Sequence, residues 1–203
     1  MNAGQRFARL VTDAVVRRPA LWRLFRRGLR AQFDRLAPVW DDMRSPDAFA
    51  PVEAALGSLA TAPKHVLDLG TGTGRVAQIV AGRFRDADVV GADISEQMID
   101  QARRKLPPEL ADRVRFEVAD ASRLPFADGE FDLVTLANMI PFFDELARVV
   151  ASGGHVLFSF SIGPDTPIWV PPERLERELS RRGFAEFASF SEGKGTAFVG
   201  RRG

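Results

Sequence analysis

The sequence predicts an α/β protein whose doubly wound, mostly parallel sheet has about seven strands and carries a helical cap at its N-terminal end. Two observations predict this class. Strand-like and helix-like segments alternate from His65 to the C-terminus, which is typical of a parallel sheet with helices on both faces. A glycine-rich stretch, 66-VLDLGTGTGRVA-77, joins the first of these strands to the first of these helices. The length of 203 residues suits one structural domain, with a cap or lid over residues 1–50 and a core over residues 51–203.

The composition is that of an ordinary globular protein, with 45% hydrophobic and 27% charged residues. The sequence has no cysteine, which excludes disulfides, thiolate metal ligands and cysteine nucleophiles, and we expect no metal site. The net charge of +1 gives no general attraction to nucleic acid. Because the N-terminus lacks the uninterrupted apolar segment of a secretory signal, we expect a cytoplasmic protein.

Helices are predicted for most of the chain up to about Ala50. Apolar residues recur there at spacings of three and four: Leu21, Leu24, Phe25, Leu29, Phe33 and Leu36. Arginines lie between them, so the predicted helix has one apolar stripe and a basic back. This pattern favours a cap helix that packs on the core with solvated arginines. A peripheral contact with an anionic membrane surface, or with an acidic partner, fits the same pattern and stays open.

The first half of the core follows in a regular order. A short helix is predicted over Val52–Ala60. The continuous apolar run His65–Leu69 predicts a strand, and the helical spacing of apolar residues in Arg75–Phe84 predicts a helix. A second strand covers Ala87–Ala92. Ser95 is expected to cap the next helix, which ends before Pro107.

The second half continues the alternation. Strands are predicted over Val114–Val118, Phe131–Leu136 and His155–Phe160, and a helix over Phe143–Val150 is expected to end at Gly153 and Gly154. A helix through Leu175 and Leu179 ends near Gly183. Strands over Phe184–Phe190 and Thr196–Val199 then flank a Gly193/Gly195 turn, so the last strand is expected to be antiparallel.

The glycine loop lies where parallel sheets bind ligands, beyond the carboxyl end of the first strand. Gly70, Gly72 and Gly74 allow a tight turn, and the following helix offers free amides to an anionic or hydrogen-bond-accepting group. A dinucleotide fingerprint would need a small residue where Arg75 stands, and a P-loop would need a lysine followed by Ser or Thr. A purely structural turn remains the alternative.

Three acids strengthen the case for a ligand site, because they stand at or near the ends of consecutive strands. Asp68 lies at the first strand, Asp93 follows the second and Asp120 follows the third. A carboxylate after the second strand can accept hydrogen bonds from both ribose hydroxyls. Asp120 is placed to accept one from an exocyclic amine. Each acid alone is more commonly a helix cap or a loop residue.

At this point the sequence resembles the class I S-adenosylmethionine-dependent methyltransferases. VLDLGTGTGRVA is similar to the first motif of that family, VVGADIS to its second-strand acidic motif, DASRLPFADGEFDLV to its adenine-side motif and ELARVVASGGHVLFSF to its fifth-strand entry. The resemblance runs from about His65 to Gly154 and implies a Rossmann-like fold. It also implies S-adenosyl-L-methionine as cofactor and S-adenosyl-L-homocysteine as product.

The resemblance also implies roles for individual residues. Asp68 would orient the loop or the amine of the cofactor, Asp93 would hold the ribose, and Asn138 would lie near the methionine part or the methyl group. The other implied contacts are Gly70, Thr71, Gly72 and Gly74 around the methionine part, Ile94 and Met98 beside the adenine, and Asp120 with the Ala121 amide at its edge.

The segment 33-FDRLAPVWDDM-43 resembles the entry segment of the ubiquinone/menaquinone-type small-molecule methyltransferases, in which an aromatic residue touches the cofactor. Trp40 holds that place here, although a core anchor is an equal reading of it. This likeness favours a small, apolar or aromatic methyl acceptor. ANMIPF follows the fourth strand instead of (D/N)PP(Y/F), which argues against the adenine and glutamine-amide N-methyltransferases of the family.

No general base is named by the sequence. His65 and His155 each begin a predicted strand, so both should lie at the edge of the sheet opposite the cofactor. Asp41, Asp42 and Asp144 are the remaining candidates, with solvated loop acids as their alternative reading. The expected function is methyl transfer to a small molecule. A non-catalytic scaffold and an RNA or protein methyltransferase that uses the basic helix are the alternatives, and the oligomeric state is not predicted.

Overall fold

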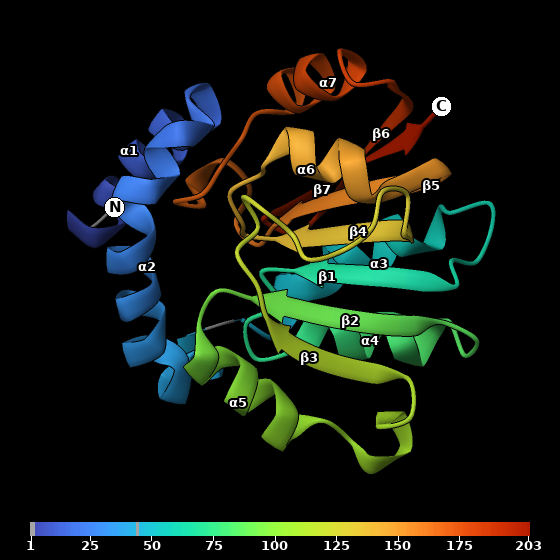
Figure 1. Cartoon of the computed structure of the whole chain (residues 1–203), viewed down its shortest axis with the longest axis horizontal. Helices are drawn as coiled ribbons and strands as arrows, with labels where there is room; N and C mark the ends of the chain where they lie inside the picture. Colours follow the sequence, from blue (N-terminus) through green and yellow to red (C-terminus); the bar gives the residue numbers. More distant parts are fainter. Residues whose placement is uncertain (1–2, 44) are drawn as a thin grey trace.

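The computed structural model, which describes residues 3–43 and 45–203, contains one sheet with the strand order β3-β2-β1-β4-β5-β7-β6 (Figure 1). Its strands are β1 (His65–Leu69), β2 (Asp88–Asp93), β3 (Val114–Val118), β4 (Phe131–Ala137), β5 (Val150–Phe160), β6 (Phe184–Glu192) and β7 (Gly195–Arg202). Neighbouring strands from β3 to β5 are parallel, and β7 is antiparallel to both β5 and β6. The predicted mostly parallel sheet with an antiparallel last strand is confirmed.

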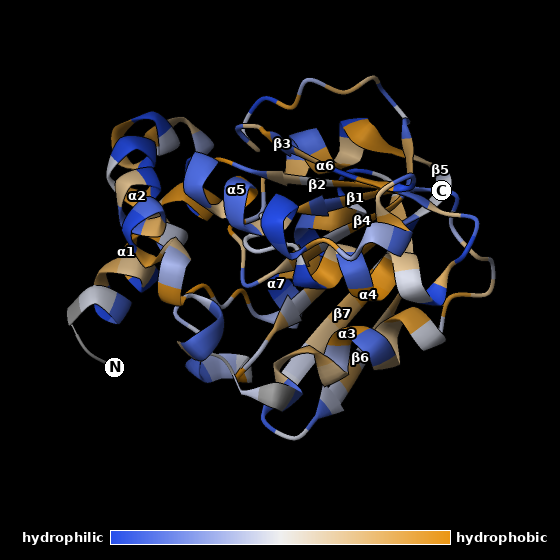
Figure 2. Ribbon diagram, turned by 90° about the horizontal axis from the view of Figure 1, so that it is seen from below, coloured by the Kyte–Doolittle hydropathy of each residue, from blue (hydrophilic) through white to orange (hydrophobic). Residues whose placement is uncertain are grey.

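Helices cover both faces of this sheet. The α-helices of the described residues are α1 (Ala3–Arg17), α2 (Trp22–Leu36), α3 (Ala50–Gly57), α4 (Arg75–Arg83), α5 (Glu96–Lys105), α6 (Phe143–Val149) and α7 (Pro172–Ser180). Successive strand residues point to opposite faces, so Val66 packs in the cluster of α3 and α4, whereas Leu67 packs in the cluster of α6 and α7. In Figure 2 the strands carry mainly apolar colours and helix α5 mainly hydrophilic ones.

The N-terminal helices stand beside the carboxyl ends of the parallel strands, where the arrowheads point toward α2 (Figure 1). Trp22 and Leu29 are buried in the same cluster as α6, and Phe25 and Phe33 pack against that cluster. These four residues repeat at helical spacing and form the inward face of α2. Leu24, which the predicted stripe included, is 69% exposed because it lies beside this face and not on it.

One predicted boundary is wrong. Gly153 and Gly154 do not end a helix, because α6 stops at Val149 and β5 begins at Val150, whose backbone is already extended. The early part of β5 is irregular, with a register shift against β4 and a φ of 79° at Gly153. His155 therefore lies within β5 instead of beginning it.

Among the described residues, none of the helices is both long and apolar enough to cross a membrane.

Candidate functional site

Asp68 anchors the glycine loop from beneath. It is 1% exposed. One carboxylate oxygen accepts hydrogen bonds from the Thr71 hydroxyl at 2.6 Å and the Ala77 amide at 3.1 Å, and the other accepts from the Thr135 hydroxyl at 2.8 Å. The carboxylate thus connects β1, the loop, α4 and β4. This geometry agrees with the loop-orienting role expected for Asp68.

The loop itself is a tight turn of left-handed glycines, with φ of 73° at Gly70, 54° at Gly72 and 83° at Gly74. A Cβ on Gly70 would lie 2.6 Å from Cγ of Met139, so the turn also needs glycine for packing. A Cβ on Gly72 would lie 3.2 Å from the Trp40 indole nitrogen. Trp40 therefore lies directly over the loop, and its ring packs edge-on against Phe33, with 5.8 Å between the ring centroids.

Asp93, at the end of β2, is a partly buried carboxylate that accepts hydrogen bonds from the backbone. Its two oxygens accept one backbone hydrogen bond each, from Gly72 and from Ser95, both at 2.9 Å. Burial raises the pKa of Asp93 to about 6, because desolvation outweighs these hydrogen bonds. The Ile94 amide contributes a third backbone interaction, and the two oxygens of a carboxylate can together accept about four hydrogen bonds. A hydroxyl donor, such as one from the ribose diol of a nucleoside, would therefore fit the remaining capacity.

Asp120 lies beyond β3 and is engaged by the cap. Its carboxylate accepts hydrogen bonds from the Trp22 indole at 2.8 Å, from Arg26 at 3.1 Å and from Ser122 through both its amide at 3.0 Å and its hydroxyl at 2.7 Å. Burial raises the pKa of Asp120, but these hydrogen bonds outweigh it, and the pKa lies below its ordinary value. The sequence analysis did not anticipate Trp22 or Arg26, because no local pattern connects α2 with the end of β3.

The cap makes further polar contacts with the loops at the strand ends. Asp34 accepts a hydrogen bond from the Ser95 hydroxyl at 2.6 Å. Asp41 accepts one from the Thr73 hydroxyl at 2.6 Å and is paired with Lys105 at 2.7 Å. Arg30 reaches Glu96 on α5 at 3.5 Å. Arg26 and Arg30 of the basic back of α2 are therefore paired with acids of the core, whereas the sequence predicted solvated arginines.

The other residues expected at the cofactor are less open. Met98 and Ala121 are 2% and 5% exposed, and Ile94 packs against the main core cluster. Asn138 has a φ of 52°, a conformation that asparagine tolerates better than most residues. Its side-chain oxygen accepts a hydrogen bond from the Ser161 amide at 2.9 Å, so this oxygen is directed toward the end of β5.

The candidate bases are dispersed. His65 begins β1, and its ring lies 3.6 Å from Asp132, at the end of the sheet away from the glycine loop. Burial and the nearby Arg201 lower the pKa of His155. Asp144 is 83% exposed and paired with Arg182 at 2.7 Å, and Asp42 is exposed next to Asp41. In the described part of the chain no three acidic, histidine or cysteine side chains group as a metal site.

One glycine was missed by the sequence analysis. Gly91 stands in the middle of β2, and a Cβ there would lie 2.4 Å from the ring of Phe116 and 2.8 Å from the Thr71 hydroxyl. The signal was present, since a glycine inside a buried strand commonly marks a close approach.

Comparison with known proteins identifies the domain around this site. The family described as "Methyltransferase domain" matches residues 66–157, which include the glycine loop, Asp93 and Asp120. The demethylmenaquinone methyltransferase of Thermus thermophilus is 45% identical over 107 residues, which cover 49% of this chain and 48% of that protein. The chain thus spans about half the length of the curated relatives it matches.

Solved structures agree on the fold. A SAM-dependent methyltransferase from Aquifex aeolicus superposes with a TM-score of 0.66 at 17% identity, covering 79% of this chain and 95% of that one. Human N-acetylserotonin methyltransferase, solved in complex with SAM, superposes with a TM-score of 0.64 at 20% identity over 89% of this chain and 58% of that one. Residues 66–157 thus match a methyltransferase domain, and the chain shares the fold of these solved methyltransferases.

Proposed function

We propose that the protein transfers a methyl group from S-adenosyl-L-methionine to a small, apolar or aromatic molecule. The observation that carries this proposal is Asp93. It is a partly buried carboxylate beside the glycine loop, its pKa is raised to about 6, and it accepts backbone hydrogen bonds from Gly72 and Ser95, with a further backbone contribution from Ile94. A ribose hydroxyl offers a further donor. The matched methyltransferase domain contains this acid and the loop.

The remaining contacts of the cofactor are assigned by their places around Asp93. The Ala121 amide and Oδ2 of Asp120, which accepts a hydrogen bond only from Arg26 among the described residues, would bind the edge of the adenine, with Ile94 and Met98 beside its faces. The backbone of Gly70 to Gly74 and the side chains of Trp40 and Asn138 would surround the methionine part. Asp68 would act indirectly, because its oxygens are occupied in holding the loop.

When bound, the cofactor supplies a methyl group on a positively charged sulfur. The task of the chain is then to align the acceptor and to exclude water. Orientation alone can lower such a barrier by about 7–11 kcal/mol. The cap of residues 1–50 is placed for this task, because Trp22, Asp34 and Asp41 all contact the loops at the strand ends.

For the acceptor, we propose an aromatic ring of the demethylmenaquinone type. Several relatives are named for methylation of that compound, and the relative with 45% identity is one of them. A carbon of the electron-rich quinol ring would form the new bond to the methyl carbon as the bond to sulfur breaks, S-adenosylhomocysteine would be released, and the ring carbon would then lose a proton. Neither histidine is placed to take this proton, so we assign no general base.

Two other classes of function are less well supported. A scaffold that binds the cofactor without catalysis would keep the same loop and acids, and the transfer assay below separates it from an enzyme. An RNA or protein methyltransferase would use the arginines of α2, but Arg26 and Arg30 are paired with acids of the core. We further propose that the protein works in the cytoplasm, which fractionation of cells expressing the full chain would test.

A transfer assay tests the proposed activity. The purified chain is incubated with S-adenosylmethionine carrying a labelled methyl group and a short-chain demethylmenaquinol. Labelled lipid-soluble product is expected from the wild type and from Asp88→Asn, which alters an exposed acid at the opposite end of β2. Asp93→Asn should form little product. If the wild type binds the cofactor but labels neither this acceptor nor other phenols and quinols, the scaffold alternative is favoured.

A further inference from the structure

A pocket of about 710 Å³ opens between the α1–α2 junction and the helices α6 and α7. Its size is in the range of small-molecule sites, about 300–1,000 Å³. The described residues that line it include six arginines: Arg17, Arg23, Arg26, Arg174, Arg181 and Arg182. The three acids in the lining are Asp144, Glu145 and Glu178. The pocket is therefore rich in positive charge, and the proposed reaction assigns no role to Arg17, Arg23 or Arg174.

The acids of the pocket already have partners. Arg182 pairs with Asp144 at 2.7 Å and with Glu178 at 3.1 Å, and Arg181 lies 3.6 Å from Glu178. Glu145 pairs with Arg148, which lies outside the pocket, at 2.8 Å. The carboxylates that could neutralise further arginines are thus used.

Three arginines remain, and they come from three different elements. Arg17 ends α1, Arg23 lies in the first turn of α2, and Arg174 lies in the first turn of α7. None of them has an ion pair or a side-chain hydrogen bond within the described chain. The Nε–H of Arg174 is buried and has no acceptor. Buried donors are almost always paired in native proteins, so this group indicates a missing acceptor.

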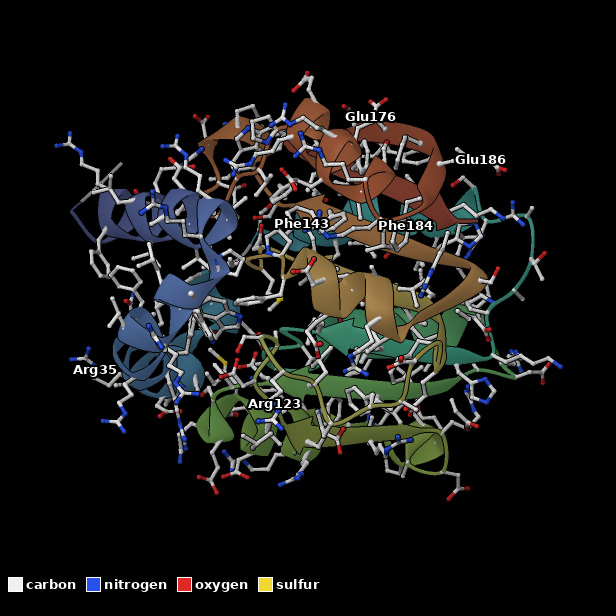
Figure 3. All side chains as sticks on the ribbon, turned by 45° about the horizontal axis from the view of Figure 1, so that its top comes forward. Arg35, Arg123, Phe143, Glu176, Phe184 and Glu186 are labelled. Carbon is white, nitrogen blue, oxygen red and sulfur yellow. The ribbon has the colours of Figure 1, made fainter. Side chains whose placement is uncertain are left out.

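The rest of the lining is largely apolar. Val16, Trp22, Phe142 and Phe143 contribute to the wall, and Figure 3 labels Phe143 on α6. A ligand that suits both halves of the pocket carries a strongly anionic group and an apolar part. One guanidinium group can donate two parallel hydrogen bonds to the oxygens of a phosphate. Three guanidinium groups balance the charge of a diphosphate better than that of a single carboxylate.

We propose that this pocket is a second binding site, for a small molecule that carries a diphosphate or phosphate group on an apolar part. Arg17, Arg23 and Arg174 bind the phosphate oxygens, and the aromatic wall contacts the apolar part. The pocket does not include the glycine loop, but it adjoins the adenine side of the proposed cofactor site, because Trp22, Arg26 and Ser122 line it and also donate hydrogen bonds to Asp120. Its phosphate can belong to a soluble compound or to the head group of a lipid.

Calorimetric titration of the full chain with inorganic pyrophosphate at low ionic strength tests the site. The wild type is expected to bind, and Arg174→Gln should weaken binding at least tenfold. Arg35→Gln is the matched control, because Arg35 is an exposed arginine in the last turn of α2 and does not line the pocket. Arg174→Lys keeps the charge but loses the planar fork, so it should bind more weakly than the wild type.

A second arm separates the two sources of the phosphate. Vesicles of phosphatidylcholine with and without phosphatidic acid are sedimented with each variant. Retention on the acidic vesicles that depends on Arg174 identifies a lipid head group, whereas binding of pyrophosphate without retention identifies a soluble ligand. Thermal unfolding of each variant shows that it is folded. The proposal is overturned if neither probe distinguishes Arg174→Gln from Arg35→Gln, or if neither probe binds the wild type.

Discussion

Cofactor affinity is expected to depend on pH through Asp93, because only the ionised carboxylate can accept hydrogen bonds at both oxygens. Burial raises the pKa of this group to about 6 in the free protein. Protonation converts one oxygen into a donor that opposes the hydroxyl donors of a ribose. Affinity for S-adenosylhomocysteine should therefore fall as the pH is lowered through this pKa.

The size of the effect follows from the ionised fraction. With a pKa of about 6, roughly nine tenths of the Asp93 carboxyl groups are ionised at about pH 7 and roughly one tenth at about pH 5. If only the ionised form binds, the dissociation constant rises about tenfold between these two values, which corresponds to about 1.4 kcal/mol. Bound ligand stabilises the ionised form, so the pKa of Asp93 should be lower in the complex.

In contrast to cofactor affinity, the stability of the free protein should decrease as the pH rises. The folded protein holds the Asp93 proton to higher pH than the unfolded chain, whose carboxyl has an ordinary pKa of 3.8. The stabilisation from the neutral acid is thus complete below the unfolded pKa and is lost as the pH rises through about 6. The stability of Asp93→Asn should not show this decrease with rising pH.

The assay is calorimetric titration with S-adenosylhomocysteine at several values between about pH 5 and pH 7. The dissociation constants of the wild type and Asp88→Asn should rise about tenfold as the pH is lowered over this range. Asp93→Asn should bind weakly, with little dependence on pH. A dissociation constant for the wild type that is the same across this range would refute the role given to the Asp93 carboxylate.

Two further predictions concern the framework under the site. Gly91→Ala should lower stability by about 1–3 kcal/mol, because its Cβ would lie 2.4 Å from the Phe116 ring. Gly82→Ala is the control, since a Cβ there meets open space in α4 and should leave stability unchanged or raise it. Thermal unfolding of both variants measures the effect, and equal melting temperatures would count against the packing argument. Thr135→Val removes a hydroxyl donor from the buried Asp68 carboxylate and should cost about 1–3 kcal/mol in urea unfolding; an unchanged midpoint would show that this hydrogen bond contributes nothing.

The sheet could be predicted from the sequence because its signals are local. Buried strands such as β1 are short continuous apolar runs, and Ser95 is a standard helix cap whose hydroxyl does accept from the Met98 amide at 3.1 Å. The end of α6 could not be predicted in this way. Gly153 and Gly154 look like a helix stop, but the pairing of β5 with β4 starts at Val150 and overrides them.

The acids of the site were predictable in position but not in their partners. Their places follow from the ends of consecutive parallel strands, and this rule requires no tertiary contact. The donors to Asp120 come from Trp22 and Arg26, almost a hundred residues earlier in the chain. Such a contact depends on how the cap docks. For the same reason, the arginine pocket between the cap, α6 and α7 has no signature in the sequence.

The central claim is that the glycine loop and Asp93 form a binding site for S-adenosylmethionine. Calorimetric titration of the wild type, Asp93→Asn and Asp88→Asn with S-adenosylmethionine at neutral pH tests it most directly. We predict one binding site in the wild type and in Asp88→Asn, and at least tenfold weaker binding in Asp93→Asn. Equal affinity of all three proteins would contradict the claim, as would the absence of binding to the folded wild type.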